Sequence, residues 1–140
     1  MNVYADTSAL AKLLLEEPGS ERMREVHQAA DSISSASIAY VELRAVLAAA
    51  QRDGRIPPAQ RTVVRAELEA LWLRIGEVAI DRVLLLAAAD FAESQALRGY
   101  DAVHLAGLTR LAVSADIAFA CWDKDLRAAA QRLGYALIPE

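Results

Sequence analysis

Short apolar runs that alternate with longer helical patterns constrain the fold of this chain more than any other feature. Five such runs read as buried strands, at residues 3–5, 33–36, 75–80, 117–122 and 136–138. The segments between them carry apolar residues at helical spacing. Because parallel strands need a crossover connection, this alternation predicts an α/β fold with a mostly parallel five-stranded sheet covered by helices on both faces.

Polar and small residues predict where several of these helices begin and end. Asp81 is expected to cap a long helix rich in alanine and leucine, which runs to Leu97 and is stopped by Gly99. The next helix is expected to open at Tyr100. Ser37 is a further predicted cap, directly after the second strand.

Length, composition and net charge narrow the kind of protein that this chain can be. A chain of 140 residues with 55% hydrophobic residues is expected to form one domain over residues 1–140. No apolar run approaches the roughly 20 residues of a membrane helix and no signal peptide is recognisable, so we expect a soluble cytoplasmic protein without membrane contact. Cys121 is the only cysteine and is expected to act as a small hydrophobic residue. The net charge of −4 argues against a broad, nonspecific nucleic-acid coat.

Four acidic residues stand out by their place in this pattern. Asp6 and Asp123 each follow a predicted strand, and Glu42 and Asp101 fall in early helical turns. In an open α/β sheet, ligands bind beyond the carboxyl ends of the strands, so these side chains can converge there. Asp101 requires in addition that its helix folds back over this edge. Taken singly, such acids can also be plain helix caps or compensate a helix dipole.

Carboxylates that converge repel one another. At ~4 Å and an effective dielectric constant near 20, each pair costs about 4 kcal/mol, so a cluster needs protonation or a cation. Oxygen ligands without a cysteine and histidine set favour Mg²⁺ or Mn²⁺. Such an ion can activate water and stabilise the charge that develops on a phosphate, which predicts hydrolysis of a phosphodiester.

Four segments resemble the successive motifs of the PIN domain, namely residues 6–13 (DTSALAKL), 40–43 (YVEL), 100–106 (YDAVHLA) and 122–126 (WDKDL). Over its full length the chain resembles a stand-alone VapC-type toxin of a type II toxin–antitoxin system. The resemblance implies a three-layer α/β/α fold and a Mg²⁺- or Mn²⁺-dependent endoribonuclease with RNA as its substrate. It also implies a homodimer and a cognate VapB-like antitoxin that inserts a segment into the catalytic groove.

The resemblance also assigns residues to the site. The positions that match the four acids of the family's metal site are Asp6, Glu42, Asp101 and Asp123. Thr7 and Ser8 match hydroxyl positions that would orient the first carboxylate or a metal-bound water. Asp125 lies two residues after Asp123 and could share or replace its role. His104 shares a helix face with Asp101 and is expected to pack or to support the site rather than to act as a general base.

The basic residues nearest to these motifs could line a path for RNA, namely Lys12, Arg44, Arg98, Lys124 and Arg127. An alternative function is a catalytically inactive PIN-like module that acts through protein or RNA contacts, although the presence of all four acids argues against it. A phosphatase on a similar sheet is disfavoured because Ser8 stands where a second aspartate would be needed.

Overall fold

A five-stranded parallel sheet forms the centre of the computed structural model, which describes residues 1–140. Its strands are β1 (Asn2–Ala5), β2 (Ser32–Ala36), β3 (Gly76–Val78), β4 (Ile117–Ala120) and β5 (Leu137–Ile138). They lie in the order β3-β2-β1-β4-β5, and every pairing is parallel. β1 is central, with Val3 opposite Ile33 on one side and Ala118 on the other. The predicted five-stranded sheet is confirmed.

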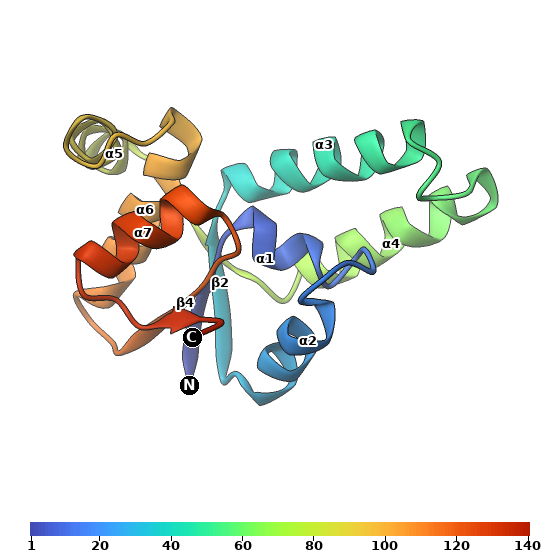
Figure 1. Cartoon of the computed structure of the whole chain (residues 1–140), viewed down its shortest axis with the longest axis horizontal. Coiled ribbons are helices and arrows are strands. Elements are labelled where there is room, and N and C mark those ends of the chain that lie inside the picture. The colour runs from blue at the N-terminus through green and yellow to red at the C-terminus, as the bar shows by residue number, and fades with distance from the viewer.

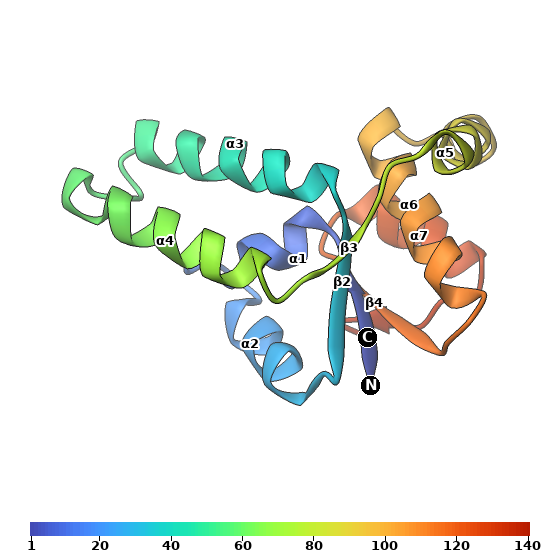
Figure 2. The ribbon, with the colours of Figure 1, turned by 180° about the vertical axis from the view of Figure 1, so that it is seen from behind.

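Helices cover both faces of this sheet, which confirms the three-layer α/β/α fold (Figure 1). One layer contains α1 (Thr7–Ala11), α2 (Ser20–Ala29), α3 (Ile38–Arg52), the short 3-10 helix η1 (Pro58–Gln60) and α4 (Arg61–Trp72). The other contains α5 (Arg82–Ser94), α6 (Gly99–Ala112) and α7 (Lys124–Arg132). Figure 2 shows α3 and α4 extending together away from the sheet. None of the helices combines the length and apolar character needed to cross a membrane.

Two hydrophobic cores lie between the layers, and the alternation of side chains along β1 assigns its residues to them. Val3 and Ala5 pack with the first layer of helices, whereas Tyr4 packs with the second. The ring of Tyr4 leaves no room on α6, since a Cβ atom on Gly107 would lie 2.6 Å from its hydroxyl oxygen. A glycine at this position therefore allows α6 to approach the centre of the sheet.

Several predicted boundaries differ from the structure. β3 contains only residues 76–78, because this edge strand pairs with β2 alone and only over three residues. β4 ends at Ala120, where its neighbour β1 turns into α1 and offers no further partner. The prediction that Gly99 stops a helix is wrong, because α5 already ends at Ser94, Ala96 takes the left-handed conformation (φ 52°) and Gly99 begins α6.

Candidate active site

Asp6 lies at the end of β1 and begins α1. Its Oδ1 accepts a hydrogen bond from the backbone N–H of Ala9 at 3.0 Å, and the Ser8 hydroxyl donates to both carboxylate oxygens at 2.7 and 2.9 Å. The thiol of Cys121 donates to Oδ2 at 3.2 Å. Burial raises the pKa of Asp6 above its ordinary value, although His104, when its ring is protonated, and these donors act to lower it. Asp6 therefore caps a helix and also keeps its carboxyl group in a buried setting that disfavours the free anion.

Asp123 follows β4 and, like Asp6, lies at the N-terminus of the next helix. Its Oδ1 accepts hydrogen bonds from the backbone N–H groups of Asp125 and Leu126 at 3.1 and 2.9 Å, so Asp123 caps α7. Two residues, Cys121 and Trp122, separate it from the end of β4. The exposed Asp125 contributes its backbone N–H to this cap. Capping engages Oδ1 of Asp123, while Oδ2 is the atom nearest to the guanidinium of Arg98.

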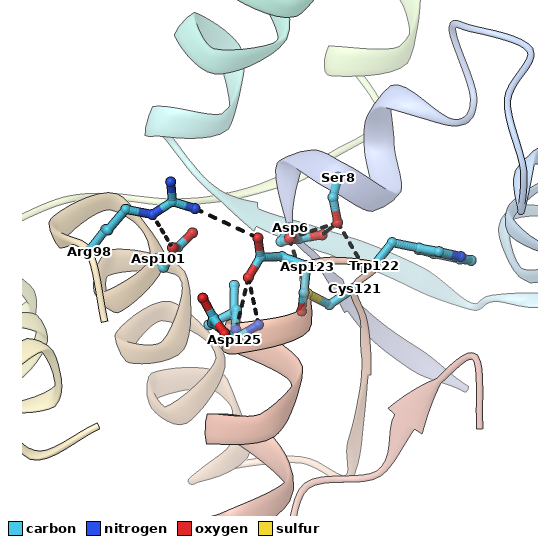
Figure 3. A network of polar contacts seen from close by, with 9 residues as sticks. Asp6, Ser8, Arg98, Asp101, Cys121, Trp122, Asp123 and Asp125 are labelled. Atoms are coloured by element: carbon cyan, nitrogen blue, oxygen red, sulfur yellow. Dashed lines mark hydrogen bonds and ion pairs between the residues drawn. The ribbon is translucent and has the colours of Figure 1, made fainter. Parts of the chain in front are cut away.

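Asp101 lies in the first turn of α6 and is buried, with 6% of its surface exposed. Arg98 places Nε 3.4 Å from Oδ2 of Asp101 and Nη2 3.8 Å from Oδ2 of Asp123 (Figure 3). Burial and then the charge of Asp123 raise the pKa of Asp101, whereas Arg98 acts to lower it. The two acids are thus near enough to repel, and one guanidinium contacts both.

Glu42 on α3 is held by residues from two other helices. Oε1 of Glu42 accepts the hydroxyl proton of Thr7 at 2.8 Å and lies 2.8 Å from Nε2 of the buried His104. On the other side of the ring, Nδ1 of His104 lies 3.1 Å from the hydroxyl of Tyr4, which already accepts the backbone N–H of Ala36 at 3.0 Å. Burial raises the pKa of Tyr4, so its hydroxyl stays protonated and donates a hydrogen bond to Nδ1. Nε2 then carries the imidazole proton and donates to Glu42.

Cys121 connects the first and last of these acids. In addition to its contact with Asp6, its Sγ lies 3.7 Å from the backbone oxygen of Asp123. The contact with Asp6 was not predicted, because it depends on the register of two strands distant in sequence. Ala5 of β1 lies opposite Ala120 of β4, which brings the residues that follow them together.

The four predicted acids therefore stand at one edge of the sheet and are joined by shared neighbours. Arg98 contacts Asp101 and Asp123, and Cys121 contacts Asp6 and Asp123. His104, which contacts Glu42, is also near enough to Asp6 and Asp101 to lower their pKa values when its ring is protonated. No three acidic, histidine or cysteine side chains are gathered closely enough to hold one metal ion in the arrangement observed.

The other basic residues singled out from the sequence lie in different environments. Lys12 is buried, forms an ion pair with Glu17 at 2.9 Å and lies over the ring of Trp122. Arg44 donates to the hydroxyl of Tyr40 at 3.2 Å. Arg127 donates to the backbone oxygens of Cys121 and Pro139. Lys124 is exposed. Arg98 is the one member of the five whose side chain contacts the predicted acids.

A family model described as the PIN domain matches residues 3–132 of the chain. The chain belongs to the PIN domain family. Curated relatives agree with this assignment. Ribonuclease VapC49 of Mycobacterium tuberculosis (strain ATCC 25618 / H37Rv) is 35% identical over 138 residues, which cover 98% of this chain and 94% of the relative. Ribonuclease VapC46 of the same strain is 31% identical over 141 residues, with 97% and 95% covered.

Solved structures share the fold of this PIN domain at lower sequence identity. The crystal structure of PAE2754 from Pyrobaculum aerophilum aligns with a TM-score of 0.68 at 15% identity, covering 99% of this chain and 84% of the other. The crystal structure of FitAcB from Neisseria gonorrhoeae aligns with a TM-score of 0.67 at 18% identity, covering 98% and 96%. At these identities the likeness concerns the fold alone.

Proposed function

We propose that this PIN domain is a metal-dependent endoribonuclease toxin that hydrolyses RNA phosphodiester bonds and is neutralised by a cognate VapB-like antitoxin. The observation that carries the proposal is the set of four acids at the carboxyl edge of the sheet, each from a different segment of the chain. The identity of 35% to curated VapC ribonucleases over nearly the whole chain supports the same reaction.

The residues that would hold Mg²⁺ or Mn²⁺ are Asp6, Glu42, Asp101 and Asp123. Their donor chemistry fits a hard cation, because all their ligand atoms are carboxylate oxygens. The raised pKa values of Asp6 and Asp101 are further support, since a cation would relieve the cost of ionising both groups. When bound, such an ion supplies an activated water and positive charge for the phosphate.

The neighbours of these acids have positioning roles in the proposal. Ser8 and the N–H of Ala9 fix the orientation of the Asp6 carboxylate. Thr7 and His104 both donate to Oε1 of Glu42, so the other oxygen is available to the proposed cation or to its water. Asp125 supports Asp123 through its backbone N–H, and we assign the fourth acidic position to Asp123 on this basis.

Cleavage of RNA by the purified protein tests the proposal. We expect cleavage with Mg²⁺ or Mn²⁺, complete inhibition by EDTA and no cleavage by Asp6→Asn. Asp116→Asn is the matched control, since Asp116 is an exposed aspartate in the loop before β4. The same two variants, expressed in cells, should respectively lose and retain inhibition of growth. Full activity of Asp6→Asn would remove the mechanism.

We also propose that the chain forms a homodimer through the apolar face of α5. Val83, Leu85 and Leu86 on this helix are 72%, 48% and 55% exposed. Leu85 lines a shallow groove with Tyr100, the neighbour of Asp101, so this face adjoins the site. In analytical ultracentrifugation, Leu86→Glu should shift the protein to a monomer, whereas Val113→Glu, at an isolated exposed valine, should not. An unchanged dimer in Leu86→Glu would exclude this interface.

The cognate antitoxin and a cytoplasmic location complete the proposal. An enzyme that cleaves cellular RNA acts where that RNA is found, and the buried free thiol of Cys121 is compatible with a reducing compartment. We expect the adjacent open reading frame to encode a short protein with a DNA-binding N-terminus. Coexpression of that protein should abolish RNA cleavage and restore growth.

A further inference from the structure

Arg98 lies beside two acids of the proposed site that repel each other, Asp101 and Asp123. Its guanidinium faces Asp101 and Asp123, at 3.4 and 3.8 Å from their Oδ2 atoms (Figure 3). Asp101 is buried, and 30% of the side-chain surface of Asp123 is exposed. Two carboxylates in such a setting need a positive charge near both of them. Arg98 provides this charge from within the chain.

The guanidinium of Arg98 is held loosely in this position. Its side chain is 64% exposed, and both contacts are long for charged hydrogen bonds. By comparison, Arg110 makes two short bonds to Asp81, at 2.7 and 2.9 Å. The ring of Tyr100 lies 5.1 Å from the guanidinium of Arg98, within the range of a cation–π contact. Arg98 can therefore leave the two acids while it keeps a favourable contact.

We propose that Arg98 is a resident counter-ion of the acidic site, and that a divalent cation must displace its guanidinium to bind Asp101 and Asp123. The inference rests on the proposed metal-dependent function and concerns the occupancy of that same site. Arg98 stabilises the metal-free protein by reducing the repulsion between the two acids. Arg98 also lowers the apparent affinity for the cation. The cation can bind only those molecules in which the guanidinium has left the two acids, and these are only part of the population.

Titration with Mn²⁺ in the absence of RNA, followed by the electron paramagnetic resonance of free Mn²⁺, tests the inference. Because Arg98 contacts two acids through weak, exposed ion pairs, we expect Arg98→Gln to bind Mn²⁺ about two- to thirtyfold more tightly than wild type. Arg98→Lys keeps a positive charge and should stay near wild-type affinity. Arg65→Gln is the control, because Arg65 forms an exposed ion pair with Glu69 within α4.

Thermal unfolding provides a second readout that a merely structural role would not produce. In EDTA, Arg98→Gln should unfold at a lower temperature than wild type, and saturating Mn²⁺ should raise its Tm by more than it raises that of wild type. A variant that loses the same stability with and without Mn²⁺ would contradict the inference.

The outcomes separate this inference from the proposed function. Normal Mn²⁺ binding by wild type, together with equal or weaker binding by Arg98→Gln, overturns the counter-ion role alone. Absence of Mn²⁺ binding by wild type contradicts both the inference and the metal dependence on which it rests.

Discussion

His104 on α6 places Nε2 2.8 Å from Oε1 of Glu42 on α3, which connects two helices from opposite faces of the sheet. The imidazole is almost completely buried, and Tyr4 fixes its other nitrogen. His104 is therefore a positioning residue for Glu42. The orientation of Glu42 thus depends on a side chain that need not touch the substrate.

His104→Ala should slow RNA cleavage and weaken Mn²⁺ binding, because Glu42 loses the donor that orients it. Loss of such a supporting contact typically costs about 10- to 100-fold in activity or metal affinity. The buried hydroxyl of Tyr4 also loses the acceptor of its proton, so the free energy of unfolding should fall by about 1–3 kcal/mol. Steady-state kinetics, Mn²⁺ titration and chemical denaturation measure the three effects. His104→Gln offers both a donor and an acceptor, and failure of this variant to recover any activity would contradict the positioning role.

Asp6→Asn should stabilise the metal-free protein while it abolishes cleavage. Because burial raises the pKa of Asp6 above 3.8, ionisation of this group lowers the free energy of unfolding as pH rises beyond that value. The asparagine carries no such charge, and its side-chain oxygen can still cap α1. In EDTA at neutral pH we expect the Tm of Asp6→Asn to exceed that of wild type by a few degrees. This difference in Tm should shrink as pH falls toward 4. A lower Tm for Asp6→Asn than for wild type at neutral pH would argue against a costly buried charge.

Several features of the fold and site could be predicted because they depend on neighbours in the sequence. Asp81 was expected to cap a helix and does so, with its Oδ1 accepting the N–H of Leu84 at 2.9 Å. The alternation of strands and helices likewise led to the sheet. By contrast, Gly99 was misassigned, because a glycine is equally compatible with a helix end and with a first helical residue, and Ala96 took the left-handed position instead.

Contacts between distant segments could not be predicted in the same way. The thiol of Cys121 contacts Asp6 only because β1 and β4 pair in one register, and Arg98 contacts Asp123 only because α6 begins beside the start of α7. Both contacts depend on packing between elements more than 20 residues apart. The positions of the acids after strands and in early helical turns were enough to predict the edge of the sheet at which they lie. The contacts that Cys121 and Arg98 make with them could be identified only from the structure.

Gly107→Ala should destabilise the protein, although alanine normally favours a helix over glycine. The added methyl group would lie 2.6 Å from the hydroxyl oxygen of Tyr4 and 3.0 Å from its ring. Overpacking of a buried site costs about 1–3 kcal/mol, which denaturant unfolding can measure. Gly99→Ala, where an added Cβ meets nothing within 4 Å, is the control and should not lower stability. Combining Gly107→Ala with Tyr4→Phe should recover part of the loss, and complete tolerance of the single variant would disprove the close packing.

Asp81→Ala should lower the Tm at neutral pH, because Asp81 caps α5 and pairs with Arg110. The hydrogen bonds from Arg110, followed by that from Leu84, lower the pKa of Asp81 from 3.8 to about 2. Its contribution to stability is therefore present above pH 3.8 and is lost as pH falls toward 2. The Tm difference between wild type and variant should narrow over this interval. A constant difference would assign the effect to the side chain's shape rather than to its charge.

Anomalous diffraction from crystals of the wild-type protein grown with Mn²⁺ tests the central claim most directly. The account predicts an anomalous peak at the carboxyl edge of the sheet, within coordination distance of carboxylate oxygens from the four acids Asp6, Glu42, Asp101 and Asp123, and loss of that peak in Asp6→Asn. Saturating Mn²⁺ with no peak at this edge, or a peak held by other residues, would contradict it.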